Sequence, residues 1–161
     1  MLHSERHLVQ TTWATLAPNA PAVAVLFYDR LFTLDPSLRL MFAHADMAEQ
    51  GKKLTQMLSV AVASLDRLEQ LVPAVEALGR RHAAYGVRDE HYDTVGRALL
   101  DTLALGLGQA FTSDVRGAWA AVYATLSGFM RRAAAEQEAA LCDAAAVCRT
   151  AARRRRGRAV A

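Results

Sequence analysis

Apolar positions recur along this chain every three to four residues, which is the spacing of amphipathic helices, and no segment alternates as a half-buried strand would. The spacing predicts helices of unequal length joined by short connections, at about residues 4–16, 21–34, 36–42, 47–65, 73–85, 89–108 and from 112 onward. The chain shows no internal repeat. An irregular all-α fold therefore accounts for the pattern better than a four-helix bundle does.

Prolines and glycines mark where these helices begin and end. Each of the four prolines precedes or begins a predicted helix. We expect Pro73 to begin the helix over residues 73–85, and Gly86, followed by Val87, to end it. The polar residues 44–50 form a predicted corner before the longer helix that follows.

Length and composition favour one soluble domain. A chain of 161 residues can bury a sizeable core, and none of its apolar runs reaches the roughly eighteen residues that span a membrane. The first residues do not have the pattern of a secretory leader. The two cysteines, Cys142 and Cys148, lie six positions apart in an alanine-rich segment, which is not a metal-binding spacing. We expect a cytoplasmic protein with reduced thiols.

The formal net charge of +3 comes from the C-terminal end. Five arginines lie among the last nine residues, and without them 14 basic residues remain against 16 acidic ones. We therefore predict no specific binding of nucleic acid by the domain. For the tail, a solvated end and an arginine-rich contact with a membrane surface both stay open.

His82 is the strongest candidate for a functional side chain in the sequence. It lies on an amphipathic helix just before the break at Gly86 and Val87. A histidine so placed can hold a metal ion at a fixed depth in an apolar pocket, because its imidazole nitrogen is a good axial ligand. A half-buried histidine that binds no metal is the commoner arrangement, so the assignment of His82 as a ligand depends on the surrounding residues. The other histidines are expected at the surface: His3, His7, His91 and His44, the last of which has the alternative of reaching from the polar corner toward a bound metal.

Six short motifs occur in order at compatible spacing, over residues 27–32, 35–42, 50–54, 79–87, 91–96 and 118–123. Together they resemble the bacterial single-domain globins related to flavohaemoglobins. The resemblance implies a globin fold of seven to eight helices around haem b, which is iron protoporphyrin IX. The globin domain would span residues 1–132, with a helical extension and a basic tail over residues 133–161. His82 would be the proximal ligand of the haem iron.

The same resemblance assigns residues to the distal side of the haem. Tyr28 and Gln50 would point at the gas ligand, and Leu54, one turn beyond Gln50, would form an apolar wall. Phe42 would pack on the haem face, and Lys53 would lie near the pocket mouth, where it can pair with a propionate. Donors such as the Tyr28 hydroxyl would stabilise a bound gas that carries partial negative charge. Two alternatives remain: Tyr28 can bond a backbone carbonyl instead, and a slip of one residue in the corner would move Gln50 off the pocket.

On the proximal side, the resemblance places Val87 and Tyr92 against the haem pocket, with Tyr92 helping to hold His82. In that family a glutamate on the last helix completes the hydrogen-bond network of the ligand histidine. The matching position here is Ala134, and the nearby Glu136 and Glu138 are out of register. Without that carboxylate the histidine donates less electron density to iron, which argues against peroxidase-like chemistry and fast NO dioxygenation.

The function that we expect is reversible binding of O₂, or of another diatomic gas such as NO or CO, for oxygen transport, storage or scavenging. No catalytic residue is assigned. One alternative is an NO dioxygenase that takes electrons from an external reductase, since the sequence has no glycine-rich nucleotide loop. A gas or redox sensor is the other. The sequence does not distinguish a monomer from a homodimer.

Overall fold

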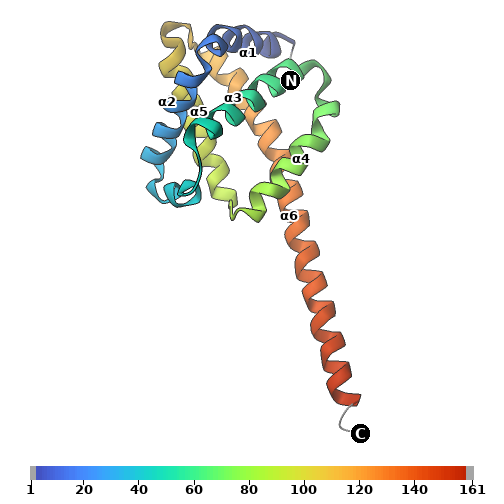
Figure 1. Cartoon of the computed structure of the whole chain (residues 1–161). Coiled ribbons are helices and arrows are strands. Elements are labelled where there is room, and N and C mark those ends of the chain that lie inside the picture. The colour runs from blue at the N-terminus through green and yellow to red at the C-terminus, as the bar shows by residue number, and fades with distance from the viewer. Residues whose placement is uncertain (1–2, 159–161) are drawn as a thin grey trace.

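The computed structural model describes the backbone of residues 3–158 and the side chains of residues 3–153 (Figure 1). Its α-helices are α1 (His3–Leu16), α2 (Ala20–Leu34), α3 (Met47–Ala63), α4 (Leu68–Ala84), α5 (Asp89–Leu107) and α6 (Ser113–Arg158). Short 3-10 helices lie between them: η1 (Ala17–Asn19), η2 (Pro36–Phe42), η3 (Leu65–Arg67) and η4 (Gly108–Ala110). No strand occurs within the described residues. The predicted all-α class is confirmed.

The main core lies where α1, α2, α5 and α6 pack together. Trp13 and Trp119 meet there edge to face, with ring centroids 6.2 Å apart. The indole N–H of Trp119 donates to the Thr12 hydroxyl at 3.0 Å, and that of Trp13 donates to the Ser59 hydroxyl at 3.0 Å. Both tryptophans therefore bury large apolar rings without leaving a donor unsatisfied.

Helix α4 packs mainly against α6. The closest approach is at Gly79, where a Cβ atom would lie 2.4 Å from the carbonyl oxygen of Met130 and 2.6 Å from its Cα. These are backbone atoms, so they cannot move aside as a side chain can. A small apolar cluster on α3 and α4, formed by Ala61, Leu71 and Val75, supports the same contact. The position of the second half of α4 is thus set by α6.

The prediction that Pro73 begins this helix is wrong. Helix α4 begins at Leu68, and Pro73 lies inside it. In the second turn, proline removes the hydrogen bond to the carbonyl of Glu69, and its ring also crowds that carbonyl. Burial of Leu71 just before it, with 6% of its surface exposed, favours keeping the first turn helical.

The predicted end of α4 at Gly86 and Val87 agrees with the structure. Gly86 has a φ of +86°, in the left-handed region. The N–H of Val87 donates to the carbonyl of His82 at 3.0 Å, and the N–H of Gly86 donates to the carbonyl of Ala83 at 3.0 Å. This pair of bonds is the Schellman motif that commonly closes a helix at glycine. It also ties the backbone of His82 to the turn.

Gly86→Ala should lower the free energy of unfolding by about 1 kcal/mol, because a Cβ atom is disfavoured at positive φ. The space around Gly86 is open, so no clash adds to this backbone strain. Urea unfolding followed by circular dichroism measures the change. A variant as stable as the wild type would show that the turn relaxes without cost.

Helix α6 continues far beyond the rest of the molecule (Figure 1). Every residue from Glu138 to Arg153 is exposed. None of the described helices has the length and hydrophobicity needed to span a membrane. The side chains of the predicted arginine run beyond Arg153 lie outside the described residues, so a membrane-surface contact through them stays a prediction.

Candidate functional site

His82 lies half-buried in the last turn of α4. Its Nδ1 is 2.8 Å from the carbonyl oxygen of Leu78, one turn earlier. A carbonyl only accepts, so Nδ1 carries the proton and Nε2 keeps its lone pair. Burial lowers the pKa of His82, which keeps the imidazole neutral at neutral pH. This protonation state and tautomer are those in which histidine ligates a metal ion.

The structure brings the predicted Tyr28 and Phe42 together. Their ring centroids are 5.4 Å apart in an edge-to-face contact that joins α2 to η2. Phe27 and Phe32 complete the cluster, at 5.1 Å and 6.0 Å from the Tyr28 ring. Burial, with no compensating hydrogen bond or charge, raises the pKa of Tyr28 to about 12. Its phenol therefore stays protonated and keeps a proton to donate.

Helix α3 carries the other predicted distal residues. Gln50 and Leu54 are half-buried one turn apart, whereas Lys53 is exposed. The carboxylate of Asp46 caps the helix by accepting from the backbone N–H of Ala48 at 2.9 Å. This cap fixes where α3 begins, and so it fixes the register of Gln50 on the helix.

Helices α2 and α3 cross where Gly51 lies against Ala24. Several apolar side chains on α2, η2, α3 and α5 pack against the core on one side and stay partly exposed on the other: Tyr28, Phe42, Leu54, Leu58 and Val95. Partly covered apolar side chains of this kind suit a flat apolar cofactor. Partly covered apolar side chains and a free imidazole nitrogen on α4 are the kinds of group that hold a haem.

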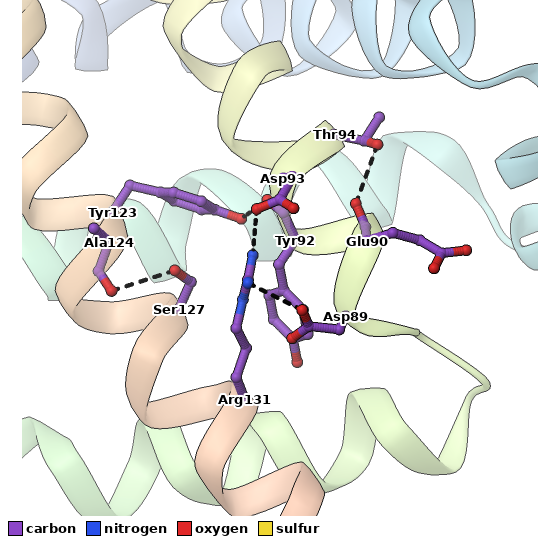
Figure 2. A network of polar contacts seen from close by, with 9 residues as sticks. All are labelled: Asp89, Glu90, Tyr92, Asp93, Thr94, Tyr123, Ala124, Ser127 and Arg131. Carbon is purple, nitrogen blue, oxygen red and sulfur yellow. Dashed lines mark hydrogen bonds and ion pairs between the residues drawn. The ribbon is translucent and has the colours of Figure 1, made fainter.

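The start of α5 is held to α6 by a polar network (Figure 2). The guanidinium of Arg131 bonds Asp93 at 2.6 Å and Asp89 at 3.2 Å, and it lies 5.3 Å from the centroid of the Tyr92 ring. The hydroxyl of Tyr123 donates to the backbone carbonyl of Tyr92 at 2.5 Å. Tyr92 itself is buried, and its hydroxyl has no hydrogen-bond partner among the described residues. A buried phenol without a partner can still donate a hydrogen bond to a group on the proximal side of the pocket.

The α6 side chain on Tyr92 is thus a cation, Arg131, and not a carboxylate. Ala134 is half-buried, while Glu136 and Glu138 are exposed. Sequence reasoning missed Arg131. Asp89 and Asp93 could have indicated it, because two acidic side chains on one helix face repel each other unless a basic side chain lies between them.

The expectation that His91 lies at the surface is wrong. Its side chain is buried, with 7% exposed, and its Nδ1 accepts the backbone N–H of Arg88 at 3.0 Å. The imidazole thereby satisfies a donor at the start of α5 that the helix itself cannot. His3, His7 and His44 are exposed, and Val87 is half-buried beside the end of α4.

Comparison with known proteins identifies the family of the chain. The globin family model matches residues 25–130. A neuroglobin from Tetraodon nigroviridis is 31% identical over 141 residues, which cover 80% of this chain and 89% of that protein. A flavohemoprotein from Bordetella parapertussis is 34% identical over 127 residues, 78% of this chain but only 32% of the flavohemoprotein. The chain therefore spans about a third of the flavohemoprotein and nearly all of the neuroglobin.

A solved structure shows the same fold. An engineered carbene transferase, described as a putative nitric oxide dioxygenase from Rhodothermus marinus, has a TM-score of 0.79 and 26% sequence identity. The similarity covers 88% of this chain and 99% of that one. The predicted resemblance is confirmed: this chain belongs to the globin family, whose members bind haem and, through it, diatomic gases.

Proposed function

We propose that this globin holds haem b through Nε2 of His82 and binds O₂ reversibly. The observation that supports the assignment most directly is the contact between Nδ1 of His82 and the Leu78 carbonyl, which leaves Nε2 free on a neutral ring. When bound, haem supplies a ferrous iron that takes a diatomic gas as a reversible ligand. The turn at Gly86 and Val87 fixes the backbone of His82 and so limits movement of its ring.

The distal residues would serve this function in two ways. Tyr28 offers a protonated hydroxyl in an apolar cluster, and Gln50 offers a side-chain amide from α3. Both are donors to a ligand with partial negative charge. Phe42 and Leu54 would exclude water, which slows oxidation of ferrous iron. An exposed Lys53 is free to pair with a propionate at the pocket mouth.

Tyr28→Phe should raise the rate of O₂ dissociation by about tenfold or more, because it removes a donor from a dry pocket while keeping the ring. Stopped-flow absorption after mixing the oxygenated protein with dithionite and CO measures this rate. Tyr85→Phe is the matched control, since Tyr85 is 73% exposed. Equal rates for the wild type and Tyr28→Phe would remove Tyr28 from the distal site.

A second candidate is an NO dioxygenase that depends on a separate reductase. Similarity to a putative nitric oxide dioxygenase favours it. The absence of a carboxylate weakens it: Ala134 stands where the flavohaemoglobin pattern has a glutamate, and the α6 side chain beside Tyr92 is the cation Arg131. NO consumption by the oxygenated protein, supplied with a flavin reductase and NADH, separates the two candidates: sustained turnover to nitrate would favour the enzyme.

We also propose a cytoplasmic location and a domain boundary near residue 132. Cys142 and Cys148 are free and exposed, which suits a reducing compartment. Ala133, with 2% of its surface exposed, is the last buried position on the described part of α6. The remaining helix would then be an extension with a role separate from gas binding.

A further inference from the structure

The extension of α6 beyond the globin body, residues 136–158, is a long helix, and no other part of the described chain covers it from Glu138 to Arg153. All of its residues from Glu138 to Arg153 are exposed, including Leu141 at 63% and Val147 at 69%. In proteins most of the stability of a helix comes from packing of an apolar face against other elements, and this extension has no such packing from Glu138 to Arg153. A second helix packed along the extension would supply the burial that a single one lacks.

One face of the extension has the spacing of a coiled-coil seam. Leu141, Ala145, Cys148 and Ala152 follow one another at intervals of four, three and four residues. All four are exposed. One large and three small side chains suit close packing against a helix that presents a small residue opposite each large one.

Acidic and basic residues are separated along the same segment. The acidic residues Glu136, Glu138 and Asp143 occupy its first half. The second half is basic, from Arg149 through Arg153 to the end of the helix. Two copies paired in parallel would place like charges side by side, whereas antiparallel copies place each acidic half beside a basic half.

We propose that the extension pairs antiparallel with the same segment of a second copy of this chain. In this register Leu141 packs on Ala152 of the second copy, and Ala145 packs on Cys148 of the second copy. Glu138 lies level with Arg155 of the second copy. The end of each helix at Arg158 then reaches the level of residue 135, where the other copy's α6 leaves its globin body, an overlap of about 36 Å. The pairing would join two gas-binding domains without covering either haem site.

Sedimentation equilibrium of the full chain tests the pairing. We expect a dimer of twice the 17.5 kDa chain mass at micromolar concentration, weakened by high salt. Glu138→Arg should raise the dissociation constant about tenfold or more, and adding Arg155→Glu should restore it. The control is Glu69→Arg, the same charge change at an exposed position on α4, which should have no effect.

Disulfide formation tests the orientation. In a Cys142→Ser background, Ala145→Cys should form an interchain disulfide with Cys148 much faster than the chain with Cys148 alone does. In parallel helices Cys148 would face Cys148 of the second copy, so the chain with Cys148 alone would form its disulfide as fast as the Ala145→Cys chain. Equal rates for the two would therefore overturn the proposed orientation. A chain that stays monomeric at tens of micromolar would overturn the pairing itself. If that monomer sediments with phosphatidylserine vesicles, the arginines serve membrane contact instead.

Discussion

Gly79→Ala is expected to lower the free energy of unfolding by about 3 kcal/mol, at the upper end for overpacking of a core. The added Cβ would lie 2.4 Å from the Met130 carbonyl oxygen, so α4 and α6 must separate. Because α4 packs mainly against α6, no other large contact can compensate. Urea unfolding of the apoprotein, followed by circular dichroism, measures the loss.

The matched control is Gly117→Ala on α6, where an added Cβ meets no atom within 4 Å. Alanine has the better helix propensity, so this control should gain about 0.5–1 kcal/mol. Gly79 also lies one turn before His82 on the same helix. We therefore expect Gly79→Ala, but not Gly117→Ala, to weaken haem retention as well. Equal stability of the two variants would mean that α4 and α6 are not in such close contact.

His82→Gly is expected to abolish stable haem binding. The substitution removes the imidazole whose free Nε2 is the proposed ligand and leaves a space of its size in the last turn of α4. Added imidazole should enter that space and restore an axial ligand. Titration of the apoprotein with haem, followed at the Soret band with and without imidazole, measures both effects.

His44→Gly is the control for this experiment, because His44 is exposed in the connection before α3. It should bind haem as the wild type does. If His82→Gly retained haem with an unchanged spectrum, another residue would be the ligand and the assignment of the site would be wrong. If imidazole failed to restore binding while the variant stayed folded, His82 would have a structural role only.

Helix ends that depend on local chemistry were predicted correctly from the sequence. The end of α4 was predictable because a glycine with positive φ is the usual way to close a helix, and Gly86 with Val87 forms that turn. The start of α4 was not, because tolerance of Pro73 inside the helix depends on the packing of Leu71 in the tertiary structure. Propensity alone favours proline as a first residue.

The same distinction applies to the site. The structure brings Tyr28 and Phe42 into contact, and both come from elements with strong local signals, whereas their distal role stays a prediction. Burial of His91 and the position of Arg131 were not predicted, because each depends on a partner outside its own segment or on a cap that polarity alone does not reveal. Only the fold brings Arg131 to Asp93, 38 residues away, whereas the cap made by His91 is local but involves a residue that polarity places at the surface.

The most direct test of reversible gas binding is the absorption spectrum of the ferrous protein under argon, then under oxygen, then under argon again. We predict a broad five-coordinate spectrum, a stable oxygenated form, and full return to the first spectrum. Sharp paired bands already present under argon would mean that a side chain of the protein occupies the sixth position. Irreversible conversion to the ferric form on the first contact with oxygen would contradict the proposed function.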